Sequence, residues 1–330
     1  MQETHGRLAR RRGGHWTGLG VALGLGWLAL GGVEAATVAP TSPAPARELI
    51  RDPEFRAGFI VLDPAPGRRI EVGRLLPKGA GASEPAWDLA QWSSRFPLAG
   101  EPARPAPGVS RWSNDGKAVT LGPGGAAGAD LALKVLADRE YGGRARRSGE
   151  PRVHLLVQQE FSDPPALGAL TNVWLHLEAR LLSLELHRTA EHTPSLHAAQ
   201  FQMFLTLQNR RQGSPEFGQL VWFGIPLFDD RSRVPPEHKQ QDTGGTGMFI
   251  YTPGGSVYTA QSAHDREWIT VDRELRPLLV EALASAWDRG FLRASRDLAD
   301  YRITGMNLGW EVPGLFDVEM AVRRLSLRVR

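Results

Sequence analysis

The chain has 330 residues, of which 42% are hydrophobic and 23% are charged, the composition of a folded protein and not of a disordered one. The formal net charge is only +3, which gives no reason to expect a nucleic-acid partner. Cysteine is absent, which excludes disulfides, thiolate metal sites and a cysteine nucleophile. An excess of Gly (37) and Pro (24) favours turns and short strands over long helices.

The first 35 residues have the pattern of a secretory signal peptide. Arg7 and the arginines at 10–12 precede an apolar stretch from about Trp16 to Leu30, and Ala35 provides a small residue for cleavage. The alternative is a retained membrane anchor, but the stretch is glycine-rich and shorter than the ~20 residues of a spanning helix. We therefore expect a secreted or periplasmic protein without stable membrane insertion, exported by the general or the twin-arginine route.

Residues 36–50 are rich in Pro and Ala and predict a short linker. From residue 51 to residue 330 no composition shift, repeat or charge run divides the chain. The sequence predicts a single domain there, with two smaller domains as the alternative.

Alternation of apolar and polar residues predicts β-strands over 153–161, 173–181, 200–208 and 318–329. In the last of these strands the apolar positions change parity between Val322 and Leu325. A change of parity requires one extra residue, so we expect a β-bulge at Arg323–Arg324.

Leucines at three- and four-residue spacing predict one α-helix over about 272–290, with Asp272 as a candidate N-cap and Gly290 as its end. Many alternating strands with one inserted helix indicate two antiparallel sheets that pack face to face. The predicted fold is therefore an all-β, jelly-roll β-sandwich.

The polar sides of the strands are rich in amides, imidazoles and indoles. They comprise three groups: His154, Gln158 and Glu160; Trp174, His176 and Glu178; Gln200, Gln202 and Gln208. Amides and imidazoles donate and accept hydrogen bonds, and a flat indole covers the apolar face of a sugar. This mixture favours a neutral poly- or oligosaccharide as the partner, and the alternative is an ordinary solvated face.

No motif implies a cofactor or a metal. The glycine run at 244–247 lacks the Lys of a phosphate loop, and Asp229 and Asp230 lack the ligand spacing of a calcium loop. No Gly-x-Ser-x-Gly motif of a serine hydrolase is present. Three histidines are five residues apart, unlike metal-ligand pairs: His187, His192 and His197.

The segment from Asp265 onward contains a short strand, the helix, a strand over 301–308, the sequence Gly-Trp-Glu-Val-Pro-Gly at 309–314, and a closing strand. This order resembles the C-terminal end of family 12 glycoside hydrolases, exported endoglucanases and xyloglucanases with a concanavalin A-like jelly roll. In that family the corresponding strand ends in Gly-Thr-Glu-Pro-Phe, and its Glu is the general acid/base. The resemblance implies this role for Glu311, although Trp310 stands where Thr is usual and the Phe is absent.

The nucleophile motif of the family, Glu-Leu-Met-Ile-Trp, is matched only in its second half by residues 219–222, and Gly218 stands where its Glu would be. A retaining mechanism needs two carboxyl groups about 5–5.5 Å apart. A partner for Glu311 would therefore come from another strand, and Glu178 and Glu160 are the candidates.

Two functions follow. In the first, an exported hydrolase cuts a β-linked polysaccharide with Glu311 and Glu178 as catalytic residues, and packing near Trp310 weakens the acidity of Glu311. In the second, the same fold is a non-catalytic glycan-binding or structural envelope protein. Under either function, the expected ligand-binding residues are Trp174, His176, Gln200, Gln202, Trp222 and Trp310.

Overall fold

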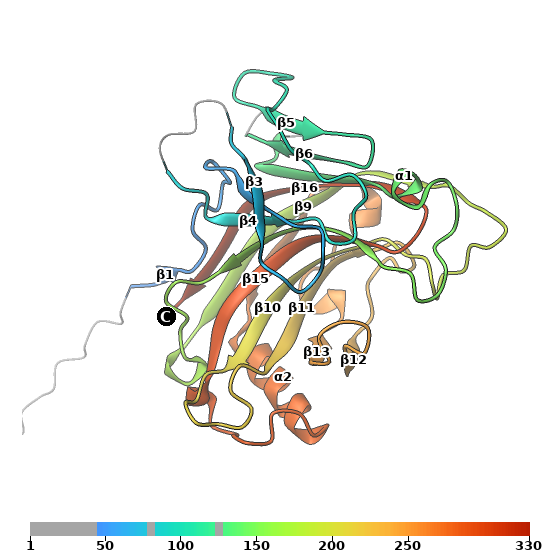
Figure 1. Ribbon diagram of the computed structural model, residues 1–330. Coiled ribbons are helices and arrows are strands. Elements are labelled where there is room, and N and C mark those ends of the chain that lie inside the picture. The colour runs from blue at the N-terminus through green and yellow to red at the C-terminus, as the bar shows by residue number, and fades with distance from the viewer. Residues whose placement is uncertain (1–44, 78–82, 123–127) are drawn as a thin grey trace, which may run out of the picture. The chain divides into compact units, whose positions relative to one another are not determined.

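The computed structural model describes residues 45–77, 83–122 and 128–330. Their strands form two sheets (Figure 1), and the apolar sides of both sheets enclose one hydrophobic core. The expected signal peptide, and the linker up to residue 44, lie outside the described residues.

The first sheet has seven strands in the order β14-β9-β16-β7-β6-β5, with β1 paired to the end of β16, and all its pairs are antiparallel. The strands are β14 (Ile269–Glu274), β9 (Val173–Leu186), β16 (Phe316–Val329), β7 (Leu131–Leu136), β6 (Lys117–Leu121), β5 (Ser110–Ser113) and β1 (Arg47–Glu48).

The second sheet has nine strands in the order β12-β13-β11-β10-β15-β8-β4-β2-β3. Its pairs are antiparallel except β11 with β13 and β2 with β4, which are parallel. The strands are β12 (His238–Gln241), β13 (Phe249–Thr252), β11 (Leu220–Asp229), β10 (Gln200–Asn209), β15 (Tyr301–Val312), β8 (Val153–Glu160), β4 (Trp87–Ala90), β2 (Phe59–Leu62) and β3 (Glu71–Leu75).

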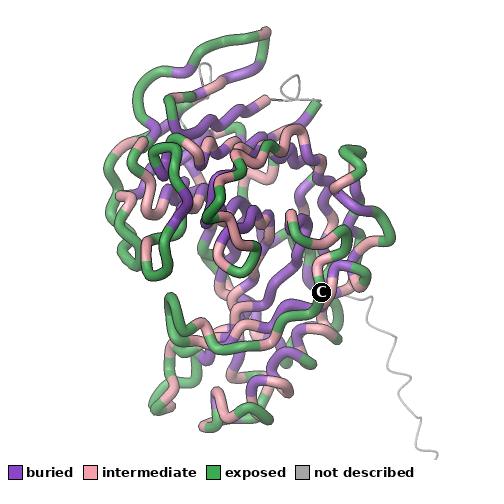
Figure 2. Tube along the Cα trace, turned by 90° about the vertical axis from the view of Figure 1, so that its right-hand side faces the viewer, coloured by how far each residue is buried: buried purple, intermediate pink, exposed green. Residues whose placement is uncertain are grey.

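The alternation in sequence produces the alternation of burial along each strand. On β10, every second side chain from Phe201 to Leu207 is fully buried, and the side chains between them are partly exposed. Figure 2 shows the result for the chain, with buried segments along the strands and exposed segments in the connections. The predicted strands and the all-β sandwich are confirmed.

The long helix, α2 (Arg276–Asp288), is confirmed with narrower bounds than expected. It packs against β11 and β13 through Leu279, Ala282, Leu283 and Ala286. Gly290 has φ +85°, a left-handed conformation that glycine adopts without strain, and follows the helix end. The prediction of Asp272 as N-cap is wrong, because Asp272 lies inside β14 and pairs with His176 of β9.

The remaining helices are short. Those that lie entirely within the described residues are the α-helix α1 (Ala137–Tyr141) and the 3-10 helices at Leu167–Ala169, Gly255–Val257, Ala263–Asp265 and Leu298–Asp300. No helix in the described part of the chain is long and apolar enough to cross a membrane.

The predicted β-bulge in β16 is confirmed. The register against β9 shifts between Arg323 and Ser326, and Arg324 has φ +55°. The extra residue allows Val322 and Leu325 both to face the core.

The packed chain begins earlier than expected from the Pro/Ala-rich composition. Arg47 and Glu48 pair with Val329 and Arg328 of β16, and the next two side chains, at 49 and 50, are buried. The end of the expected linker is therefore part of the sandwich.

Candidate functional site

The residues expected to form one ligand site lie on two different sheets. Three of them point outward from the seven-stranded sheet: Trp174, His176 and Glu178. Four point outward from the nine-stranded sheet: Gln200, Gln202, Trp222 and Glu311. Because the hydrophobic core separates these faces, the expectation of one continuous site is wrong.

Trp310 belongs to the core. Its side chain is fully buried, its indole N–H donates to the Leu133 carbonyl over 2.9 Å, and its ring packs against Phe201 and Phe228. Trp310 and Glu311 are neighbours on one strand, so their side chains point to opposite sides of the sheet. The prediction that Trp310 binds ligand is therefore wrong.

Glu178 cannot pair with Glu311 in catalysis because it lies on the other sheet. Its carboxylate accepts hydrogen bonds from Arg323 over 2.6 Å and from Arg324 over 2.7 Å. Burial would raise the pKa of Glu178, but the two arginines hold it below its ordinary value. Glu178 is a structural partner of the β-bulge.

Glu160 shares the outward face of the nine-stranded sheet but lies far from Glu311. His154 is the β8 residue opposite Glu311, and Glu160 is six residues further along that strand. At about 3.4 Å per residue the separation is roughly 20 Å, which excludes Glu160 as its catalytic partner.

A row of polar side chains follows the outward side of β10. Gln200, Gln202, Thr206 and Gln208 are partly exposed, and Phe204 interrupts the row. We call the outward side of β8, β15, β10 and β11 the amide face, after its Gln158, Asn307, Gln200, Gln202 and Gln208 side chains. Phe204 is apolar but stands at a position where the alternation of β10 predicts a polar, outward side chain. Such an exception in the sequence indicates a surface that is not ordinary solvated strand.

Some amides of this face are available to a ligand. Gln202 and Gln158 make no side-chain hydrogen bond within the described residues, whereas Gln208 donates to the Gly218 carbonyl over 2.7 Å. An amide that is held in place on a strand and lacks a protein partner can exchange its water for a ligand hydroxyl.

Trp222 of β11 is the aromatic side chain next to these amides. It is opposite Thr206 in register, and its ring packs edge-to-face against Phe204 with 6.1 Å between ring centroids. Its indole N–H donates to the hydroxyl of Thr246 over 3.0 Å. Asp242 accepts hydrogen bonds from both the backbone N–H and the hydroxyl of Thr246, so the turn that holds the indole is itself fixed.

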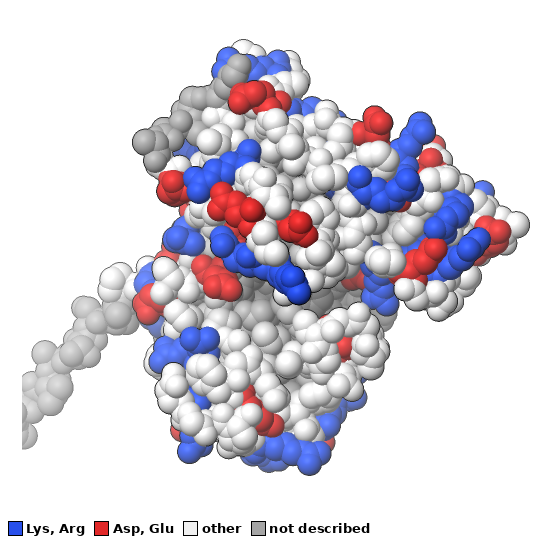
Figure 3. Space-filling model, in the orientation of Figure 1, with Lys and Arg blue, Asp and Glu red and all other residues white. Residues whose placement is uncertain are grey.

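The surface is hollowed on this side of the molecule. Figure 3, in the same view as Figure 1, shows a hollow between an upper part with many charged side chains and a lower part whose surface is mostly uncharged. Such a depression can accept an extended ligand.

Glu311 lies at the end of β15, opposite Gln200 on one side and His154 on the other. Its carboxylate lies 2.9 Å from Nη1 of Arg152 and 3.6 Å from Nε2 of His154, and its side chain is 22% exposed. Burial alone would raise the pKa of Glu311, but the contacts with His154 and Arg152 lower it to about 2. The expectation of weakened acidity is wrong.

Asp229 is the nearest carboxylate on the same face in the direction of β11. It is opposite Gln200, whose amide donates to Oδ2 over 2.8 Å. Arg231 binds both its oxygens, over 2.8 and 2.6 Å. Burial would raise the pKa of Asp229, but the hydrogen bonds from Arg231 keep it below its ordinary value.

Asp230 differs from its neighbour. Burial and the charge of Asp229 raise its pKa to about 6, although the backbone N–H of Ala199 donates to Oδ1 over 2.6 Å. Among the carboxyl groups of the described residues, Asp230 is the one whose pKa is raised. In the sequence the two aspartates suggest only a calcium loop, because nothing local places Asp229 opposite Gln200.

Trp92 lies beside β8, at the edge of the amide face opposite to Trp222. Its ring contacts that of His154 edge-on with 5.7 Å between centroids, and its carbonyl accepts the backbone N–H of His154. It also packs on Leu62 and Leu156 at the outward side of the sheet. Nothing in the sequence distinguishes Trp92 from the other tryptophans of the N-terminal half.

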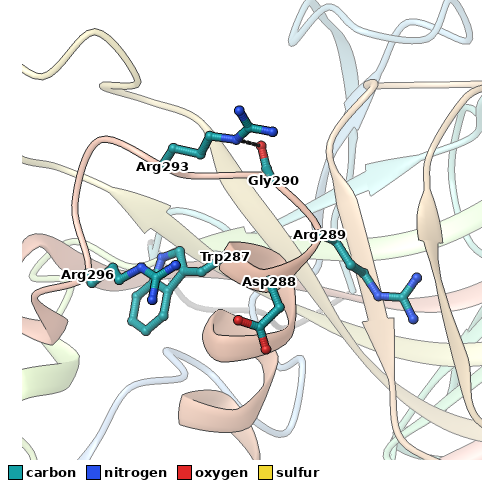
Figure 4. A pocket seen from close by; sticks show the side chains of 6 residues that line it. All are labelled: Trp287, Asp288, Arg289, Gly290, Arg293 and Arg296. Atoms are coloured by element: carbon teal, nitrogen blue, oxygen red, sulfur yellow. Dashed lines mark hydrogen bonds between the residues drawn. The ribbon is translucent and has the colours of Figure 1, made fainter. Parts of the chain in front are cut away.

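A pocket of about 410 Å³ lies elsewhere, at the C-terminal end of α2 (Figure 4). It is lined by Trp287, Asp288, Arg289, Gly290, Arg293 and Arg296. In Figure 4 the three guanidinium groups lie apart and do not surround one ligand position. The described residues also contain no cluster of three His, Asp or Glu side chains placed to hold a metal ion.

No family model and no curated protein sequence matches this chain. Similar solved structures include a cellulase derived from Cel12A of Rhodothermus marinus, with 10% identity, a TM-score of 0.38, and coverage of 74% of this chain and 100% of that one. A family 12 xyloglucanase from Bacillus licheniformis has 10% identity and a TM-score of 0.37, and the match covers 73% of this chain and 93% of that one. A family 11 xylanase from Neocallimastix patriciarum has 11% identity and a TM-score of 0.33, and the match covers 71% of this chain and 98% of that one. At these identities and TM-scores the structures assign neither a family nor an activity to the chain.

Proposed function

We propose that this protein binds a neutral poly- or oligosaccharide along the amide face. The observation that carries the proposal is the row of strand-held amides beside the ring of Trp222. Sugar hydroxyls both donate and accept hydrogen bonds, as an amide does, and the C–H face of a pyranose packs on an aromatic ring.

The charges of this face favour a neutral ligand over an acidic one. Glu311 is paired with Arg152, and Asp229 is paired with Arg231. These ion pairs leave little unpaired charge to attract a polyanion, while the amides between them offer hydrogen bonds without charge.

Export is the setting that this proposal requires, because structural polysaccharides lie outside the cytoplasm. The support for export is the signal-peptide pattern of residues 1–35. Protein collected from the periplasm or medium should begin near Ala36, which N-terminal sequencing measures.

The test of binding uses matched variants on the same face. We expect Trp222→Ala and Gln202→Ala each to weaken binding about tenfold on a panel of plant, algal and bacterial polysaccharides, because each removes a group that contacts sugar. Gln208→Ala is the control, since its amide is already bonded to Gly218. Equal binding by all three variants and the original protein would reject the proposal.

A second candidate function is hydrolysis of a β-linked polysaccharide, and the raised pKa of Asp230 favours it. Glycoside hydrolysis requires a carboxyl group that holds its proton near neutral pH and a second, ionised carboxylate. The raised pKa of Asp230 suits the acid and the lowered pKa of Glu311 suits the base. Asp230 follows Asp229, which is two strands from Glu311 in register, so the spacing favours a base that activates water over a nucleophile.

Hydrolysis and binding are distinguished by measuring reducing-end release and retention together. For a hydrolase, Glu311→Gln and Asp230→Asn should each lower release by at least about a hundredfold and leave retention intact. The rate of the original protein should fall as pH rises through about 6, because the acid then loses its proton. Retention without release under any condition leaves the binding function alone.

A further inference from the structure

We propose a second sugar-binding surface on the outward side of the seven-stranded sheet, centred on Trp174. The Trp174 side chain lies on β9 and is 42% exposed, more than any other tryptophan in the described part of the chain. An indole exposed near the start of β9, on the outward side of the sheet, lacks the packing that covers Trp87, Trp112 and Trp310.

The indole is fixed in orientation. Its N–H donates to Oδ1 of Asp272 on the edge strand β14 over 2.5 Å. Because the ring is anchored by its edge, its flat face stays available and little side-chain entropy is lost when a ligand packs on it.

Polar groups that suit hydroxyls surround the ring. His176 follows on the same side of β9 and is 32% exposed, with its Nδ1 3.6 Å from Oδ1 of Asp272. Arg328 of β16 is opposite Trp174 and is 64% exposed. The imidazole, the carboxylate and the guanidinium offer hydrogen-bond donors and acceptors around the indole ring. This arrangement suits a pyranose, whose C–H face packs on the ring while its hydroxyls bond to the polar groups.

Trp268, the residue before β14, is by contrast a covered indole. The guanidinium of Arg323 lies 4.0 Å from the centroid of its ring, and Arg323 is bonded in turn to Glu178. No arginine is placed over Trp174 in this way among the described residues.

The surface around Trp174 is separate from the amide face. The two lie on opposite sides of the sandwich, whose sheets pack about 10 Å apart, so one sugar ring cannot touch both. A long polymer or an insoluble particle can engage both surfaces, which raises retention without a new contact on either. The ligand class rests on the proposed function, but the position of the site does not.

The experiment compares the purified protein with Trp174→Ala, Trp222→Ala and the double variant. Retention is measured on insoluble polysaccharides from the same panel, and indole N–H signals are followed by nuclear magnetic resonance as soluble oligosaccharides of the same sugars are added. Phe217→Ala is the matched control, because Phe217 is 41% exposed and its ring is already covered by Arg210. Trp174→Tyr keeps an aromatic plate and tests the site if the alanine variant fails to fold.

We expect Trp174→Ala to lower retention about tenfold, and the double variant to lose more retention than either single variant. We also expect the indole N–H signal of Trp174 to shift when sugar is added to the Trp222→Ala variant. If the Trp222 signal shifts and the Trp174 signal does not, the second surface is wrong and the proposed function stands. If only the Trp174 signal shifts, the amide face is wrong and the second surface stands. If neither signal shifts, or if Trp174→Ala changes the oligomeric state in size-exclusion chromatography, the second surface is rejected.

Discussion

Glu311 and Asp229 lie on either side of Gln200, each in register with it, so the two carboxylates face the same side of the nine-stranded sheet with one strand between them. Two strand spacings place their backbones roughly 10 Å apart. Both carboxylates are paired with arginine and both pKa values are lowered. Both carboxylates are therefore ionised at neutral pH and held by arginine, so this pair does not provide the one protonated and one ionised carboxyl group that glycoside hydrolysis requires.

Glu311→Gln should reduce stability at neutral pH and have little effect at low pH. A carboxyl group with a lowered pKa stabilises the folded state above its ordinary pKa, and this contribution disappears as pH falls from about 5 towards 2. The expected loss at pH 7 is up to about 3 kcal/mol. Urea unfolding at pH 7, 5 and 3 measures it, and a difference that does not shrink at low pH would contradict the assignment.

Asp230→Asn should have the opposite dependence on pH. A raised pKa means that ionisation is less favourable in the folded state, so the folded protein loses stability as pH rises from about 4 through about 6. Asparagine does not ionise and keeps an oxygen for the Ala199 N–H. We expect the variant to be more stable than the original protein above pH 6 and similar to it at pH 4, as measured by thermal unfolding at both values.

Lys117→Met should destabilise the fold by about 3–5 kcal/mol. Lys117 and Glu140 form a salt bridge of 2.6 Å in which both side chains are fully buried, and burial lowers the pKa of Lys117. The single variant leaves the Glu140 carboxylate buried without its cation. Lys117→Met combined with Glu140→Leu should recover much of the loss in chemical denaturation, and failure to recover would show that the lysine contacts to Phe96 and Ser94 dominate.

Trp310→Ala and Trp222→Ala should separate stability from binding. Removing the fully buried Trp310 should cost about 3–5 kcal/mol, since it leaves a cavity between Phe201 and Phe228. Trp222→Ala should weaken saccharide binding with a much smaller change in melting temperature. Calorimetric unfolding beside a binding titration measures both, and equal destabilisation would place Trp222 in the core.

Periodicity predicted β8, β9, β10 and β16, the bulge and the helix, because each depends on neighbouring residues, but it did not predict the short strands β1 to β7. It could not assign strands to sheets: β9 and β10 are consecutive in the chain, yet they lie in different sheets. His176 and Gln200 therefore looked alike in the sequence and point to opposite sides of the molecule.

The sequence around Trp310 carries the signal that places its side chain in the core. Met306, Leu308, Trp310 and Val312 share one parity on β15, which predicts the core side for Trp310 and the outward side for Glu311. The pKa of Glu311 cannot be predicted in this way, because Arg152 and His154 come from the start of β8 and the residue before it, about 160 residues earlier in the chain.

The turn at 242–248 joins β12 and β13 and closes mainly on itself, through the carboxylate of Asp242 and the N–H and hydroxyl of Thr246. It contacts the amide face through the hydroxyl that binds the indole of Trp222. Because the turn closes on itself, turns of other lengths can be grafted between the same two strands, which changes the surface beside Trp222 and leaves the sandwich beneath untouched.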